Sequence, residues 1–417
     1  MFIKCETTVL DNGVKIISER NTSVQSFSLG FWFNTGSRDE NSSNNGISHF
    51  VEHMLFEGTY KRNAKKISDE VEALGCYLNA FTTKEYTCFY GRGLSPHIKK
   101  VFEVLSDMVQ NPLFEKKEIE KEASVVIDEL YDIEDTPEEL VFDEFEKNLF
   151  RGNPLQYPII GTEKNIKNFT REDLVDFINK HYGLNNLYIV ASGNVEHNKL
   201  VKLAEKFLTS NFNTNKKSRQ TVNLKPVKDN FVYKDIQQAH LIVGKPTNGY
   251  LSRDRHIIKV LSYILGEGSS SRLFQSVREK NGIAYQVNSF LNSFYDVSSF
   301  GVYISTNDKS IAKAHELILT EFKKMREKGV TIKELKRAKE SLKSSIMMGL
   351  EDTTNRMVRI AHSSIYFNKI KTVYEYIDEI ESVNREQLLE LSYDLLDEKK
   401  MIKTFLSAKN HLLHSAA

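Results

Sequence analysis

The sequence predicts an α+β fold made of two related halves, and three observations support this class. Runs of apolar and β-branched residues that end at glycine, asparagine or serine are typical of strands. Between them lie long charged segments whose apolar residues recur at helical spacing. Segments of the first half also resemble segments of the second half in the same order, which predicts a duplicated domain with a period of about 210 residues.

The expected elements follow in chain order. An Asp-Asn-Gly turn at residues 11–13 predicts that the chain starts with two strands joined by a tight turn. Further strands are expected at 26–36, 78–82, 86–93, 186–193 and 239–246. The clearest helices, where apolar residues recur at helical spacing, are expected at 96–110, 115–133 and 332–350.

The halves meet at a polar, lysine-rich stretch, residues 211–226, which is the best linker candidate. We therefore predict an N-terminal domain over 1–212, a linker over 213–226 and a C-terminal domain over 227–417. Two pairs of segments support the duplication: 116–130 resembles 332–346, and 169–195 resembles 383–410.

Composition argues against several classes of function. Lys and Arg number 57 against 56 Asp and Glu, so no basic excess indicates a nucleic-acid partner. The three cysteines, Cys5, Cys76 and Cys88, lack paired spacing, which favours a reducing compartment over a disulfide framework. The N-terminus lacks the apolar segment of a signal peptide, and no apolar run approaches the roughly twenty residues that span a bilayer. We expect a cytoplasmic protein without a membrane partner.

The stretch HFVEHMLFEGT, residues 49–59, places two histidines and a glutamate within five positions. On a helix, His49, Glu52 and His53 fall within an arc of roughly 100° on one face, so both imidazoles can reach one ion. One interpretation is a Zn²⁺ site in which Glu52 takes a proton from the attacking water. The other is a helix with polar residues at its rim. The motif alone does not decide, because a hydrolytic zinc needs a third protein ligand.

The helix expected at 115–133 offers that ligand. Glu122 and Glu129 are seven residues apart and lie on the same stripe, beside Val125 and Val126, which we expect to be buried. The alternative is that both are surface glutamates paired with Lys121 or its neighbours.

From His49 to Glu129 the chain resembles the inverted zinc metallopeptidases, the pitrilysin or M16 family, which carry H-x-x-E-H and a downstream glutamate. The similarity extends over residues 36–62 and 74–90 and is closest to the processing-peptidase branch. The resemblance implies two homologous domains, each a mostly antiparallel sheet packed with helices, known as the LuxS/MPP-like metallohydrolase fold.

The resemblance also implies a role for each residue of the motif. His49, His53 and Glu129 would bind one Zn²⁺ per chain, and Glu52 would be the general base. Glu122 would orient a ligand or support proton transfer.

In the second half, residues 271–290 resemble the family's glycine-rich loop and the Arg and Tyr that follow it. By this resemblance Arg278 and Tyr285 hold the substrate carbonyl from the second domain. Without it, they would be interpreted as a surface arginine and a packed tyrosine. The duplicated helix places Ala338 and Ser345 opposite Glu122 and Glu129, so the second half is expected to lack a metal site.

Two further signals concern the substrate. Asn79, Ala80 and Phe81 lie in a strand that, in the family, is a sheet edge pairing with an extended peptide; the alternative is an ordinary strand. Glu139 and Asp143 are four residues apart, and in the processing branch such acidic residues accept an arginine near the cleaved bond. The alternative for this pair is a solvated face.

We therefore expect a zinc-dependent endopeptidase that cleaves unfolded peptides or presequence-like segments inside a clamshell chamber, with a homodimer as the simplest assembly. One rival is a non-catalytic binding or scaffold subunit of a heterodimer, which the intact motif argues against. Another is a zinc hydrolase of small molecules, which a closed small pocket would favour.

Overall fold

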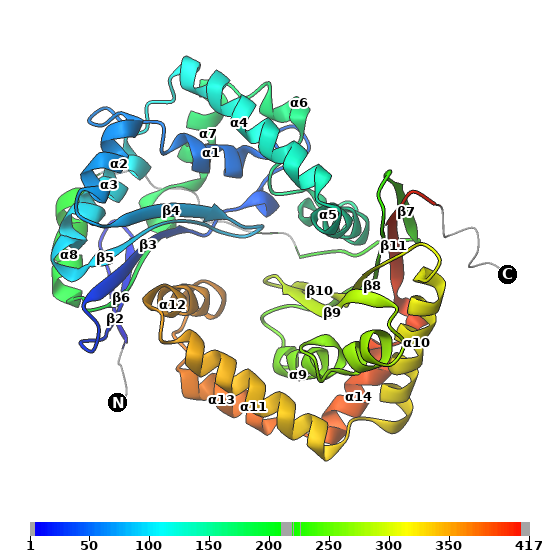
Figure 1. Ribbon diagram of the computed structural model, residues 1–417. Coiled ribbons are helices and arrows are strands. Elements are labelled where there is room, and N and C mark those ends of the chain that lie inside the picture. The colour runs from blue at the N-terminus through cyan, green and yellow to red at the C-terminus, as the bar shows by residue number, and fades with distance from the viewer. Residues whose placement is uncertain (1–4, 210–218, 220, 226, 410–417) are drawn as a thin grey trace. The chain divides into compact units, whose positions relative to one another are not determined.

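The computed structural model describes residues 5–209, 219, 221–225 and 227–409, and they form two compact units. The first unit combines residues 1–131, 157–220 and 348–370, and the second combines 132–156, 221–347 and 371–417 (Figure 1). Helices and strands are mixed in each unit, so the predicted α+β class is confirmed. No helix within the described residues is both long and apolar enough to cross a membrane.

The sheet of the first unit has the strand order β1-β2-β6-β3-β5-β4 among the described residues. Only the β2–β6 pair of this sheet is parallel in the described chain, and the other neighbours are antiparallel. The expected early strands are all present; the bounds are β1 Cys5–Val9, β2 Lys15–Arg20, β3 Ser26–Phe33, β4 Tyr77–Thr82, β5 Thr87–Leu94 and β6 Leu187–Gly193.

The sheet of the second unit repeats this pattern. Its described strand order is β7-β11-β8-β10-β9, and only the β7–β11 pair there is parallel. This order and these directions match β2-β6-β3-β5-β4, so the structure confirms the duplication. The bounds are β7 Asn230–Tyr233, β8 Ala239–Asn248, β9 Ala284–Ser293, β10 Val297–Thr306 and β11 Ile402–Ser407.

Helices cover both sheets. The helices whose residues lie mainly in the first unit are α1 Ile47–Met54, α2 Ala64–Glu72, α3 Ile98–Gln110, α4 Lys116–Asp135, α6 Glu163–Ile166, α7 Arg171–His181, α8 His197–Phe207 and α12 Thr353–Phe367. Those mainly in the second are α5 Pro137–Leu149, α9 Arg255–Gly266, α10 Ile311–Lys328, α11 Ile332–Gly349, α13 Val373–Ser382 and α14 Arg385–Leu395, with a π-helical turn η5 at Phe274–Glu279. The three expected helices correspond to α3, α4 and α11.

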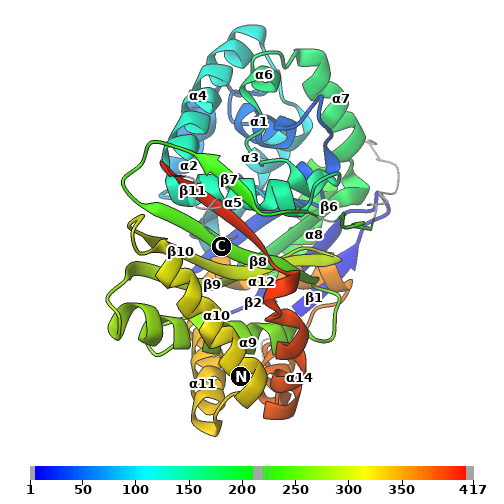
Figure 2. The same ribbon diagram turned by 90° about the vertical axis from the view of Figure 1, so that its right-hand side faces the viewer.

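The two halves of the sequence exchange one helix each. Helix α5 comes from the first half but packs on β8, β11 and β7 of the second unit, beside which it lies in Figures 1 and 2. Helix α12 comes from the second half but packs on β3, β6 and β2 of the first unit. The compact units therefore differ from the predicted domains 1–212 and 227–417, which remain a prediction about the duplicated sequence. Most of the predicted linker, 213–226, lies outside the described residues.

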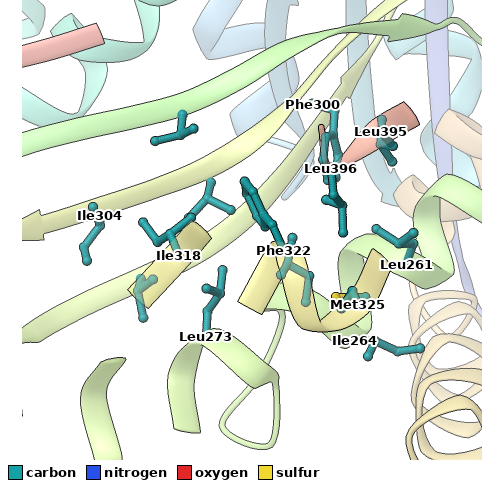
Figure 3. Close-up of a cluster of buried hydrophobic side chains, with 14 of the residues drawn as sticks. Leu261, Ile264, Leu273, Phe300, Ile304, Ile318, Phe322, Met325, Leu395 and Leu396 are labelled. Carbon is teal, nitrogen blue, oxygen red and sulfur yellow. The ribbon is translucent and has the colours of Figure 1, made fainter. Parts of the chain in front are cut away.

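One core cluster of the second unit lies between its sheet and the helices α9, α10 and α14. Figure 3 shows these buried side chains, among them Phe300, Phe322, Leu261 and Leu396. In the first unit, aromatic residues of β3 fill the equivalent space, where the Phe31 ring meets Phe102 of α3 at 5.1 Å.

Candidate metal centre

Helix α1 is fixed from its N-terminal end by a buried carboxylate. Glu40 accepts hydrogen bonds from the backbone N–H groups of Gly46 and Ser48, each at 2.8 Å, and from the Asn45 amide at 3.0 Å. Gly46 has φ 98°, a backbone conformation that glycine adopts without strain. Burial raises the pKa of Glu40 to about 7 despite these donors. These hydrogen bonds tie the first turn of α1 to the loop that precedes it.

The predicted ligands lie together on two helices of the first unit. The His49 and His53 rings of α1 have centroids 4.6 Å apart. On α4, Glu129 Oε1 lies 3.8 Å from His49 Nε2, and its Oε2 lies 3.6 Å from His53 Nε2. Each residue offers a ligand atom within 4.8 Å of the others.

These separations fit a shared metal ion better than direct hydrogen bonds. Nitrogen and oxygen ligands bind zinc at about 2.1 Å, so tetrahedral geometry places neighbouring ligand atoms roughly 3.4 Å apart. The observed 3.6 and 3.8 Å are close to that spacing and too long for good hydrogen bonds. Two imidazoles and one carboxylate are also a donor set typical of hydrolytic zinc. The residues present therefore fit the metal that the motif predicts.

Glu122 contacts the ring nitrogen of His53 that lies farther from Glu129. Its Oε1 accepts a hydrogen bond of 2.8 Å from His53 Nδ1, which leaves Nε2 of the ring on the side of Glu129. Glu122 is only 7% exposed. The alternative pairing with Lys121 is not found, because that lysine binds Glu57 at 2.9 Å and Glu118 at 3.4 Å.

One detail of the α4 prediction is wrong. We expected both valines beside the glutamates to be buried, but Val125 is 46% exposed while Val126 is fully buried. Adjacent residues on a helix differ by about 100° in direction, so Val125 can point to solvent while Val126 points into the core. Glu122, four residues before Val126, shares that inward side.

Burial and charge set the protonation of the cluster. Burial, together with the neighbouring His53, lowers the pKa of His49 to about 3, so its imidazole is neutral at pH 7, the form that binds metals. Burial alone would lower the pKa of His53, but the hydrogen bond to Glu122 and nearby carboxylates raise it overall. Burial raises the pKa of Glu52, in spite of a hydrogen bond from Thr82.

Glu52 lies beside the ligands without belonging to them. Its Oε2 accepts a hydrogen bond of 2.6 Å from the hydroxyl of Thr82, the last residue of β4. The sequence prediction did not assign Thr82 a role. The only signal for it is its position at the end of the strand already singled out at 78–82.

Asn79, Ala80 and Phe81 lie on β4, which is the last strand at one side of the described sheet. The Asn79 amide donates a hydrogen bond of 2.8 Å to the Tyr77 hydroxyl. The Phe81 ring packs edge-on against Trp32 at 5.5 Å. Side chains alternate along a strand, so Asn79 and Phe81 face away from the side on which Thr82 reaches Glu52.

Arg278 and Tyr285 belong to the second unit and contact each other. The Arg278 guanidinium donates a hydrogen bond of 3.0 Å to the Tyr285 carbonyl oxygen and lies 4.7 Å from the Tyr285 ring centroid. Tyr285 is 78% exposed, so it is not the packed tyrosine of the alternative interpretation. Its side chain is therefore open to solvent.

The other predicted positions also lie in the second unit. Glu139 is exposed and Asp143 is half-buried on α5, one turn apart. On α11, Ala338 is buried and Ser345 is exposed. No cluster of His, Cys, Asp and Glu suited to a metal occurs in the described part of this unit.

Comparison with known protein families gives two matches. Residues 15–163 match the family model described as Insulinase (Peptidase family M16), and this range includes every residue of the candidate metal centre. Residues 168–342 match the model described as Peptidase M16 inactive domain.

Curated relatives cover nearly the whole chain. A protein of Rickettsia felis named an uncharacterized zinc protease is 36% identical, over 91% of this chain and 92% of its own length. A Bacillus subtilis protein with the same kind of name is 34% identical, over 93% and 94% respectively.

Solved structures agree with the fold. The crystal structure of a protease from Helicobacter pylori superposes with a TM-score of 0.91 at 22% identity, covering 98% of this chain and all of that one. A Pseudomonas fluorescens structure described as a peptidase M16 inactive domain gives a TM-score of 0.90 at 19% identity, covering 98% of each chain.

Proposed function

This chain belongs to peptidase family M16, and on that premise we propose that it is a zinc-dependent endopeptidase acting on unfolded peptides or presequence-like segments. The observation that supports this most strongly is the cluster of His49, His53 and Glu129, with Glu52 beside it. The match described as inactive covers 168–342 and contains none of these residues, so it does not favour a scaffold role for the whole chain.

Each residue of the cluster has a distinct task in this proposal. His49, His53 and Glu129 hold one Zn²⁺ per chain, and Glu122 fixes the orientation of His53. The bound ion would polarise the scissile carbonyl and make water more acidic. Glu52 accepts the proton of the attacking water and passes it to the leaving amine. A carboxylate whose pKa is raised by burial is suited to both proton transfers.

The second unit contributes to the same reaction in our proposal. Arg278 and Tyr285 bind the substrate carbonyl and stabilise the charge that develops on its oxygen, since a guanidinium and a phenol are both strong donors. Their mutual contact and the exposure of Tyr285 support this role.

Substrate binding rests on backbone pairing. An extended peptide adds to β4 along Asn79, Ala80 and Phe81, which gives affinity without strict sequence preference. Glu139 and Asp143 accept a basic side chain of the substrate. We further propose a cytoplasmic homodimer that encloses the peptide in a clamshell chamber. The three free cysteines, Cys5, Cys76 and Cys88, support a reducing compartment.

One experiment tests the activity directly. The zinc-loaded protein and a Glu52→Gln variant are incubated with unfolded peptides, and the products are read by mass spectrometry while zinc content is measured in parallel. We expect cleavage by the wild type and a loss of at least about a thousandfold in the variant, with equal zinc in both. Equal cleavage by both preparations would overturn the proposal.

A further inference from the structure

Thr82 joins the edge strand of the first unit to the candidate general base. Its Oγ1 lies 2.6 Å from Glu52 Oε2, a short hydrogen bond between the end of β4 and the last turn of α1. Hydrogen bonds from a hydroxyl to a carboxylate of this length are among the stronger ones in proteins. Glu52 therefore has one oxygen held by the protein.

The chemistry of the neighbouring groups gives the direction of this hydrogen bond. On β5, the Thr87 hydroxyl donates to the Thr35 carbonyl oxygen at 2.9 Å, and both residues are fully buried. The Thr82 and Thr87 hydroxyl oxygens are 3.4 Å apart. A hydroxyl has one proton, so Thr87, which donates to Thr35, has none to donate to Thr82. The ionised carboxylate of Glu52 has no proton to donate either, so the single Thr82 proton is donated to Glu52.

From this geometry we infer that Thr82 is the positioning residue of the general base. It holds Glu52 Oε2, so that Oε1 is the oxygen left to accept the proton of the attacking water. The same residue lies on the strand to which the substrate backbone is proposed to add, so the base and the bound peptide share one rigid element. This inference rests on the proposed function of Glu52.

A positioning role of Thr82 and a purely structural role predict different effects when its hydroxyl is removed. A hydroxyl that only helps α1 pack on β4 would affect stability and leave the catalytic rate of the folded enzyme unchanged. A hydroxyl that orients the base affects kcat, because small misplacements of a catalytic group slow the chemical step strongly. In this role the Thr82 hydroxyl affects neither substrate affinity nor zinc binding.

The kinetic test compares Thr82→Val, Thr82→Ala and Thr82→Ser with the wild type. Valine keeps the β-branched shape and removes the hydroxyl. We expect kcat to fall by about 10- to 100-fold in the valine and alanine variants, with KM and zinc content within about twofold. Serine should restore kcat to within about threefold. Thr7→Val, an exposed position on β1 in the same sheet, is the matched control and should behave as wild type.

Crystal structures of the wild type and Thr82→Val supply a readout independent of activity. We expect the Glu52 carboxylate to leave its wild-type position in the variant while His49 and His53 stay in place. An unmoved Glu52 or an unchanged kcat in Thr82→Val would overturn the inference, as would a serine variant as impaired as the valine variant. Glu52→Gln in the same assay separates the two proposals, because its retained activity would refute the general base itself.

Discussion

His53 lies between two carboxylates of α4, and the two contacts differ in kind. Glu122 makes a hydrogen bond of 2.8 Å to Nδ1, whereas Glu129 stays 3.6 Å from Nε2, a distance suited to a shared ion. Although both are glutamates on one helix stripe, only Glu129 is at a distance that suits a ligand, whereas Glu122 is hydrogen-bonded to His53.

This difference leads to a prediction about zinc retention. Glu129→Gln should weaken zinc binding by at least about a hundredfold, because one charged ligand is lost, whereas Glu122→Gln should weaken it by about tenfold. Dialysis against graded chelator, with zinc measured by atomic absorption, would give both values. Glu120→Gln, an exposed position on the same helix, is the control. Equal affinity of the wild type and Glu129→Gln would show that another residue is the ligand.

A second prediction concerns Tyr285, whose hydroxyl is proposed to bind the substrate carbonyl. Tyr285→Phe should lower kcat/KM by roughly a hundredfold, the usual cost of losing one oxyanion donor, without changing zinc content or melting temperature. Tyr393→Phe, at an exposed position on α14, provides the control. A Tyr285→Phe variant with unchanged kcat/KM would remove Tyr285 from the reaction.

At this scale the sequence predicted that His49, His53 and Glu129 lie together and that Glu122 supports the group, but it missed the contact of Thr82 with Glu52. The helical spacing of His49 and His53 is enough to place them together, because local geometry alone decides it. Thr82 could not be found this way, since its contact with Glu52 joins residues 30 positions apart through a sheet and a helix. The prediction that Val125 is buried is wrong because an apolar residue alone does not show which face of a helix is turned to the core.

At the scale of elements, a glycine in each sheet makes room for the exchanged helix. A Cβ on Gly30 of β3 would lie 2.4 Å from Trp32 Nε1 and 2.9 Å from Met357 Sδ of α12. A Cβ on Gly244 of β8 would lie 2.7 Å from Phe145 Cζ of α5 and 2.7 Å from the Phe300 backbone oxygen. Each duplicated half therefore has a glycine in a strand against which the exchanged helix packs.

Alanine at either glycine should be destabilising. We expect Gly30→Ala and Gly244→Ala each to lower the free energy of unfolding by about 1–3 kcal/mol, because the fully buried Trp32 ring and the Phe300 backbone cannot move away easily. Urea titration followed by circular dichroism measures the change. Gly349→Ala is the control, since a Cβ there meets no atom within 4 Å. If all three variants had the same stability, close packing at Gly30 and Gly244 would not constrain the helices.

Helix α12 also brings a titratable contact into the first unit. His362 Nε2 lies 2.6 Å from the Tyr86 hydroxyl oxygen, and burial lowers the pKa of His362 from 6.5 to about 4. The folded state thus favours the neutral ring. Its contribution to stability is complete above pH 6.5 and is lost as the pH falls to about 4.

The wild type should therefore lose stability over this window faster than His362→Gln. The two slopes should differ by up to about 1.4 kcal/mol per pH unit, the effect of one proton. Urea titrations at several pH values between 7 and 4, with equal chelator present in all samples, would measure both slopes. Parallel curves would show that His362 keeps its ordinary pKa in the folded chain.

The helices predicted most clearly from the sequence include α4 but not α5, and nothing in the sequence indicates where α5 packs. Amphipathic spacing shows that a helix has a buried face but does not name the sheet that covers it. Because the halves are homologous, the sheets of both offer similar apolar surfaces. Only the structure shows that α5 and α12 are exchanged.

For the whole molecule, this exchange means that neither half of the sequence contains a complete unit. Residues 1–215 lack α12, whose Arg356 and Arg359 bind the nearly buried Glu19 of β2 at 2.7 and 2.8 Å. Without that helix the sheet would expose apolar surface, and Glu19 would lose both arginines. Residues 225–417 lack α5 in the same way, with Phe145 fully buried in the intact chain.

We therefore predict that the two fragments, 1–215 and 225–417, fold poorly alone and recover when refolded together. Each alone should bind a hydrophobic dye and show weak near-ultraviolet circular dichroism, as expected of loosely packed states. The mixture should regain zinc retention and part of the peptide cleavage.

A chain in which residues 348–370 are fused by a flexible linker to 1–215 is the decisive control, because it restores only the helix. It should gain cooperative unfolding and zinc binding without cleavage, since Arg278 and Tyr285 are absent. Cooperative unfolding of 1–215 alone would show that α12 is dispensable, and full cleavage by the fused chain would exclude the second unit from the reaction.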